Sequence, residues 1–194
     1  MTQPAQVLPL TGTWDLDPVH TRLGFAARHA MVATVHGHFA VFSGVLELDE
    51  ADPAKSSAEV RIDAASITTG NEQRDAHLRS PDFLDAERHP ELVFRSTRAE
   101  AGDGPEDYRL VGELTVRDQT HPVVLELEYQ GTAVDAFGNR RAGFEGRSTI
   151  NRKDWGLGWN MVMEAGGLMV GDRIKLELDV SAVKRAEDAP THSG

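Results

Sequence analysis

Residues 108–130 read YRLVGELTVRDQTHPVVLELEYQ, and their pattern predicts the fold class. Apolar residues or glycine hold every second position from Tyr108 to Val116 and again from Val123 to Tyr129, with mostly charged or polar residues between them. Strict alternation is typical of a β-strand that buries one face and exposes the other. The turn-forming residues between the segments, 118–122, therefore predict an antiparallel strand pair.

The same alternation recurs through most of the chain and predicts an all-β protein. Turn-forming residues such as Asp52-Pro53 and Phe137-Gly138-Asn139 separate the alternating segments. Several short strands joined by such turns indicate a sandwich or a barrel. The nine candidate strands are residues 13–17, 21–28, 35–45, 59–64, 92–96, 108–116, 123–130, 144–150 and 173–180.

Two short helices are expected within this β pattern. Thr69-Gly70-Asn71-Glu72 resembles a capping box, in which the threonine caps the helix start and the glutamate reaches back. The helix would run from Asn71 to Arg79, before Ser80-Pro81 stops it. A second helix is expected over Asn160–Ala165, because Gly166-Gly167 is a good C-terminal signal.

Length and composition bound the answer further. The 194 residues, 40% hydrophobic and 26% charged, fit one globular domain over residues 11–184 with disordered tails at 1–10 and 185–194. The net charge of −11 argues against nucleic-acid binding, which needs a basic surface. The absence of cysteine excludes disulfides and thiolate chemistry.

The start of the chain carries no feature of a secretory signal. Residues 1–10 contain neither a basic residue nor a long apolar run, and no apolar run in the chain reaches the roughly 20 residues of a transmembrane helix. We therefore expect a soluble, cytoplasmic protein.

Small residues stand beside large ones on the apolar faces of the predicted strands. Gly37 precedes Phe39, and Gly112 and Gly146 lie beside Leu114 and Phe144 in the same way. A barrel of about eight strands has room inside for its own side chains or for one slim ligand. The pattern fits either a filled core or space for a chain-like guest, and composition does not choose between them.

Several motifs, in order along the chain, resemble those of the YceI-like family. The resemblance covers about Gly12 to Lys184, and its strength lies in the order of motifs that are individually weak. The motifs are WDLDPVH (14–20), Phe25 with RHAMV (28–32), Gly37 with Phe39 and FSG (42–44), SITTGN (66–71), RDAHLRSPDF (74–83), Pro90 with Phe94, GELTV (112–116) and NRKDWGL (151–157).

This resemblance implies an extended lipocalin-like antiparallel eight-stranded barrel, with short helices after the middle strands. It also implies that the barrel encloses a long amphiphile such as a polyisoprenoid, an isoprenoid quinone or a fatty amide, and that the protein sequesters or carries it. One departure is Asp118, where the family usually has glycine in a turn, and it puts the geometry of that turn in question.

Strand faces and family motifs together give two sets of candidate ligand-binding residues. The polar set is expected at the barrel mouth, where it would anchor the chain or grip a head group: His29, Arg74, Asp75 and His77. The apolar set is expected inside the barrel: Phe25, Phe39, Ile62, Leu92, Phe94, Leu114, Leu125, Phe144, Trp155, Leu157 and Leu176. Nearby, Trp159, Met161, Met163 and Met169 suit either a variable lipid contact or ordinary packing.

The sequence shows no recognisable catalytic or metal motif. His36 and His38 are two residues apart on one strand face, which is chelating geometry, but they match no metal motif and are expected on the outer surface. No serine-hydrolase elbow, phosphate-binding loop or dinucleotide fingerprint occurs. We expect a non-enzymatic binder with a bound isoprenoid-type lipid, no metal and no required cofactor. The alternatives are an enzyme acting on a hydrophobic small molecule and a ligand-free stress or scaffold module. Strand edges and the resemblance allow a homodimer.

Overall fold

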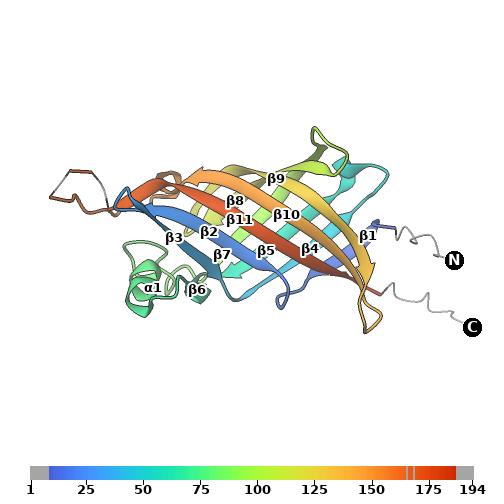
Figure 1. Ribbon diagram of the computed structural model, residues 1–194, viewed down its shortest axis with the longest axis horizontal. Coiled ribbons are helices and arrows are strands. Elements are labelled where there is room, and N and C mark those ends of the chain that lie inside the picture. Colours follow the sequence, from blue (N-terminus) through green and yellow to red (C-terminus); the bar gives the residue numbers. More distant parts are fainter. Residues whose placement is uncertain (1–8, 165, 168, 187–194) are drawn as a thin grey trace, which may run out of the picture.

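The computed structural model describes residues 9–164, 166–167 and 169–186, and Figure 1 shows a long barrel with a short helix at one end. The expected tails at 1–10 and 185–194 lie mostly outside the described residues, so the domain limits stay a prediction. The strands are β1 (Gly12–Leu16), β2 (Arg22–His29), β3 (Ala33–Phe39), β4 (Phe42–Leu48), β5 (Ser57–Asp63), β6 (Ile67–Thr68), β7 (Glu91–Ala101), β8 (Asp107–Val116), β9 (Gln119–Val134), β10 (Arg140–Asn151) and β11 (Val170–Lys184). The helices are α1 (Glu72–Arg79) and the 3-10 turns η1 (Pro53–Lys55), η2 (Ala64–Ser66) and η3 (Arg152–Trp155).

Eight antiparallel strands close the barrel, which confirms the expected fold class. Their order is β1-β4-β5-β7-β8-β9-β10-β11, and β11 pairs back with β1. Residues 182–184 of β11 pair with β1, whereas its residues 170–179 pair with β2. The sheet therefore continues from β11 through β2 and β3 to β6, and this extension reaches the end of the barrel that carries α1 (Figure 1).

The single strand predicted at 35–45 is wrong. The chain bends at Ala40 and Val41, so β3 pairs with β2 and β6 while β4 pairs with β1 and β5. The bend also changes the buried face: Phe42 and Leu46 enter the core, and Val41 is left exposed. Since side chains alternate with period two, a bend at this point moves the second half of the segment to the opposite face.

The turn in the stretch 108–130 is also shorter than expected. It consists of Arg117 and Asp118 alone, and β9 already begins at Gln119. Arg117 has a φ of 59°, a left-handed conformation that two-residue hairpin turns require. The chain therefore adopts the tight turn with an arginine and an aspartate in its two central positions.

The first helix forms, but with a different cap. Asn71 is the N-cap, and its side chain accepts a hydrogen bond from the Arg74 amide. Thr69, the expected cap, instead bonds to Asp75 within the helix. The helix therefore begins at Glu72, one residue later than the expected start at Asn71.

The second predicted helix is wrong over its described residues, 160–164. The Asn160 carboxamide pairs with both backbone groups of Val170, accepting from N at 3.0 Å and donating to O at 2.7 Å. Met169 N donates to Met161 O, so residues 160–164 and residue 169 lie on opposite sides of an irregular hairpin. The Gly166-Gly167 pair, at φ 83° and 95°, is its turn rather than a helix end.

Glycines on the inner faces make room for aromatic rings from neighbouring strands. A Cβ on Gly37 would lie 2.4 Å from Phe25, and one on Gly112 would lie 2.5 Å from Phe94. Each glycine therefore seats a phenylalanine ring instead of leaving an empty space. This favours the filled-core interpretation at these two positions.

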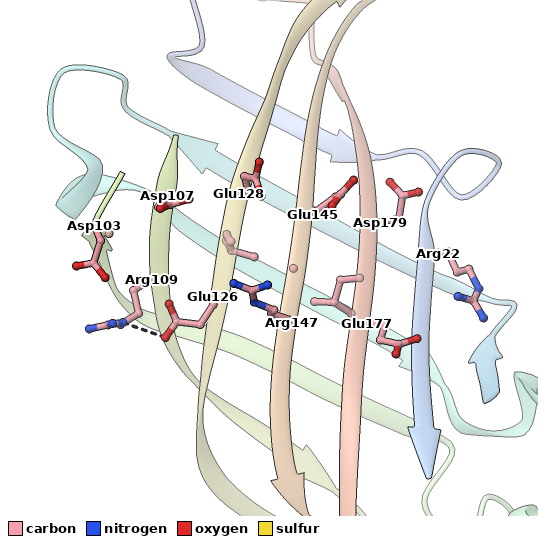
Figure 2. A pocket seen from close by; sticks show the side chains of 14 residues that line it. Arg22, Asp103, Asp107, Arg109, Glu126, Glu128, Glu145, Arg147, Glu177 and Asp179 are labelled. Atoms are coloured by element: carbon pink, nitrogen blue, oxygen red, sulfur yellow. Dashed lines mark hydrogen bonds and ion pairs between the residues drawn. The ribbon is translucent and has the colours of Figure 1, made fainter. Parts of the chain in front are cut away.

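Acidic side chains form a row across the outer wall of the barrel. Strand register places Asp107, Glu128, Glu145 and Asp179 directly opposite one another on β8 to β11, and Figure 2 shows them side by side. In the adjacent row, signs alternate, with Glu126 between Arg109 and Arg147. Like charges directly opposite one another destabilise a sheet, whereas opposite charges stabilise it.

Replacing Glu145 with Gln should therefore raise the free energy of unfolding by about 0.2–1 kcal/mol. Urea unfolding at low salt is the measurement, and the gain should shrink at high salt because exposed charges are screened. The matched control is Glu126→Gln, which should be destabilising because it breaks the 3.1 Å ion pair with Arg109. Equal effects of the two substitutions would contradict the row-by-row account.

Candidate functional site

A cavity of about 140 Å³ lies inside the barrel, and residues of all eight barrel strands line it. Its walls are almost entirely apolar and include Phe94, Leu125 and Phe144, three of the residues predicted to face inward. A few polar residues, Glu50 and Ser56 among them, also line it. The arrangement suits a guest with an apolar body and a polar end.

Tyr108 also lines this cavity. Burial raises the pKa of its phenol above the usual range, and the nearby Glu106 and Glu50 carboxylates act in the same direction. The phenol is therefore a neutral hydroxyl at physiological pH and can donate a hydrogen bond to a ligand oxygen.

A second pocket, of about 470 Å³, lies at the mouth next to α1. We call it the mouth pocket. His29, Arg74 and His77, three of the four predicted polar residues, line it together with Phe25 from the apolar set. Phe25 also packs against the core and lies 5.9 Å from Phe39, ring centre to ring centre. The floor of the mouth pocket is thus continuous with the barrel core.

The fourth predicted polar residue, Asp75, is an anchor and does not line the mouth pocket. Its carboxylate is buried and accepts hydrogen bonds from Thr69 N at 2.8 Å and Thr69 Oγ1 at 2.5 Å. Burial would raise the pKa of Asp75, but the Thr69 hydrogen bonds outweigh it and hold the pKa below its ordinary value. Arg74 also donates to Thr69, through Nε at 2.7 Å. The pair fixes α1 against the strand end.

An aromatic cluster forms one wall of the mouth pocket. His77 meets Trp159 and Phe83 edge-on, with ring centres 4.5 and 5.1 Å apart. His77 Nε2 lies 2.8 Å from the Asp82 carboxylate, which fixes the orientation of the ring. The sequence suggested His77 but left Trp159 undecided between ligand contact and packing, because the two come together only in the tertiary structure.

Arg152 holds the loop that completes this wall. Its side chain is only 3% exposed and donates to the backbone carbonyls of Leu157, Trp159, Val170 and Gly171. Burial lowers its pKa from the ordinary value, and the Asp172 carboxylate partly offsets this. Sequence reasoning missed this role, although Arg152 stood inside the NRKDWGL motif.

All eleven predicted inward residues lie in or against the two hydrophobic clusters of the barrel. Trp155 is 2% exposed, and its indole Nε1 donates to Leu114 O at 2.8 Å, so its polar atom is satisfied. Sequence reasoning did not select several leucines that line the cavity, although most of them share the predicted faces. These are Leu16, Leu23, Leu46, Leu110, Leu127 and Leu178.

The two strand histidines point outward, as expected. His36 is exposed and lies 3.6 Å from Glu177, on the side of β3 opposite the buried Gly37. Among the described residues, no three His, Asp or Glu side chains are placed to hold a metal ion. The groove of about 400 Å³ in Figure 2 lies on the outer wall, and charged side chains line most of it.

Sequence comparison identifies a family model for this chain. The model of the YceI-like domain matches residues 14–182. A UPF0312 protein of Staphylococcus epidermidis is 33% identical over 165 residues, covering 84% of this chain and 93% of the relative. A UPF0312 protein of Pectobacterium carotovorum is 36% identical over 144 residues, 74% of each chain.

Solved structures show the same barrel. The YCEI protein of Campylobacter jejuni has a TM-score of 0.70 and 27% identity, covering 82% of this chain and 90% of that one. BcnA of Burkholderia cenocepacia has a TM-score of 0.74 at 22% identity, with 86% and 98% covered. A polyisoprenoid binding domain from Saccharophagus degradans has a TM-score of 0.66 at 16% identity, with 89% and 98% covered. None of the helices among the described residues is long and apolar enough to cross a membrane.

The hydrogen bonds from Arg152 to the loop carbonyls, which we call the Arg152 latch, give a direct prediction. Replacing Arg152 with Met leaves buried carbonyls without donors, and each such acceptor costs about 1–3 kcal/mol. We expect a loss of about that size or more in the free energy of unfolding, measured in urea. Lys153→Met is the matched control, because Lys153 is half exposed and pairs only with Asp172 at the surface. It should cost less than about 1 kcal/mol, and a similar loss in both variants would count against the latch.

Proposed function

We propose that this chain, which belongs to the YceI-like domain family, binds a long-chain amphiphilic lipid inside its barrel and sequesters or carries it. The observation that carries the proposal is the mostly apolar cavity with a few polar lining residues, set on the same core as the mouth pocket. The ligand classes we favour are a polyisoprenoid, an isoprenoid quinone and a fatty amide.

The energetics of burial support such a ligand. Each methylene removed from water contributes about 0.8 kcal/mol, so an isoprene unit contributes a few kcal/mol before the cost of ordering the chain. Apolar burial is not directional, and the ligand therefore needs few hydrogen bonds. Length and width of the interior set the selectivity for the chain, and polar mouth residues choose the head group.

The cavity is small for such a guest, and this shapes the mechanism. At about 140 Å³ it is below the roughly 300–1,000 Å³ typical of small-molecule pockets, whereas the mouth pocket at about 470 Å³ is within that range. In the proposed complex the chain occupies both, and core side chains between them, Phe25 first, change rotamer to admit it.

The polyisoprenoid binding domain from Saccharophagus degradans supports the choice of ligand class by analogy of fold. A non-enzymatic role is part of the proposal, as is the absence of a required metal or cofactor. Compartment and oligomeric state stay predictions from the sequence.

Organic extraction of the natively purified protein, followed by mass spectrometry, tests the proposal. We expect a stoichiometric long-chain lipid from the wild type and none from Leu125→Arg, because a charge on the cavity wall opposes an apolar guest. Val124→Arg is the matched control: Val124 is the next residue on β9, 40% exposed on the outer face, and should leave the lipid in place.

A second variant covers the case in which Leu125→Arg does not fold. Ala99 is buried on the cavity wall, and Ala99→Leu fills the cavity without adding a charge. It should fold, as circular dichroism would show, and carry less lipid. A clean extract from the wild type, or full lipid content in folded Leu125→Arg, would overturn the proposal in favour of a scaffold or an enzyme.

A further inference from the structure

Exposed apolar side chains gather on two neighbouring loops beside the mouth pocket, and we call the four side chains named next the loop tips. In the β2–β3 turn, Met31 is 64% and Val32 is 83% exposed; on the 160–164 side of the neighbouring hairpin, Met161 is 51% and Val162 is 76% exposed. Ala30 N donates to Met169 O at 2.8 Å, so the loops lie side by side, and both extend beyond the barrel end in Figure 1.

The β2–β3 turn keeps these residues at a conformational cost. Ala30 and Met31 have φ values of 49° and 62°, and Val32 N closes the turn on His29 O at 3.2 Å. Two successive left-handed residues are what Asn-Gly would adopt most easily. The turn thus combines a left-handed backbone that alanine and methionine rarely adopt with apolar side chains on an exposed surface. Such departures from local preferences occur at functional sites more often than elsewhere.

The tips also border the opening through which a ligand would pass. Arg28 and His29 from the first loop, and Met169 and Val170 from the second, line the mouth pocket. Arg28 donates to Met31 O at 2.7 Å, which fixes the turn relative to the mouth. Whatever contacts the tips therefore lies directly against the mouth pocket.

We infer that the two loop tips insert into the interface of a lipid bilayer and so hold the mouth pocket against the surface from which its ligand is taken up. This inference rests on the proposed function. A long apolar ligand has almost no concentration in water, so direct contact with the bilayer removes the aqueous step.

The size and chemistry of the tips favour a lipid surface over a protein partner. A standard protein interface uses about 20–30 residues and about 800 Å² on each side, whereas the tips offer four exposed apolar side chains. Shallow insertion into the acyl boundary needs only a few such side chains. Methionine is flexible and fits a fluid, irregular environment.

Charge decides which bilayer is suitable. The chain carries a net charge of −11, and its outer wall bears the acidic row described above, so anionic lipids would repel it. Insertion should therefore occur on neutral, zwitterionic bilayers and depend little on salt, because apolar contacts are not screened.

The test is co-sedimentation of the purified protein with phosphatidylcholine vesicles at low and high salt. We expect wild-type binding at both, and a loss of about tenfold or more in the partition coefficient for Val32→Ser combined with Val162→Ser. Phe137→Ser is the matched control: Phe137 is 90% exposed but lies on the β9–β10 hairpin at the far end of the barrel, and its loss should change nothing (Figure 1).

A second variant separates docking from folding. Ala30→Asn combined with Met31→Gly suits the left-handed turn, so it should raise the melting temperature while weakening vesicle binding. Wild-type protein that stays in solution, or a loss caused by Phe137→Ser alone, would overturn the inference. So would a concentration-dependent dimer that Val32→Ser with Val162→Ser abolishes, because the tips would then be an interface between copies.

Lipid extraction distinguishes this failure from failure of the proposed function. If the protein carries a stoichiometric lipid but does not bind vesicles, the proposed lipid carriage stands and the inference of bilayer docking fails. If the protein neither carries a lipid nor binds vesicles, both the proposed function and the docking inference fail. Docking is supported when the tip variants, loaded with lipid from detergent, hold it normally but take it up more slowly from vesicles.

Discussion

The pairing of β11 with two different strands is the constraint on which the rest of the molecule depends. One part of β11 pairs with β1 to close the barrel and another pairs with β2 to extend it. At the junction, the buried Thr21 hydroxyl accepts from Ser181 N at 3.0 Å and donates to Ser181 O at 2.9 Å. A side chain thus bonds both backbone groups of Ser181 where one ladder ends and the next begins.

The extension creates the mouth, and buried polar groups then fix its shape. Asp75 binds α1 to Thr69, and Arg152 gathers the carbonyls of the loop that ends at Gly171. Each buried charge has partners, because an unpaired one would cost several kcal/mol. Buried hydrogen bonds therefore fix the walls of the mouth pocket. The neighbouring loop tips are apolar and exposed, and hydrogen bonds to the carbonyl oxygens of Met169 and Met31 hold the two loops in place.

Much of the fold and part of the candidate site were predictable from the sequence. The alternation of apolar residues is a local, two-residue period, so it identified most strands and predicted an inward face for Phe94 and Leu125, both of which are buried. The order of the family motifs indicated the closed barrel. The family motifs, by resemblance, also suggested His29, Arg74 and His77 as mouth residues, and all three line the mouth pocket.

Other features depended on partners distant in sequence, which only the tertiary structure supplied. The face that β4 buries follows from its pairing with β1 and β5, and not from its continuity with β3. Residues 160–164 lack a helix because the Asn160 side chain forms hydrogen bonds with the Val170 backbone instead. The glycines that looked like free space hold the rings of Phe25 and Phe94. The sequence by itself thus determined which side chains are apolar and which of them alternate along a strand. Tertiary contacts decided how much empty space remains inside the barrel, because side chains from strands distant in sequence pack against one another there.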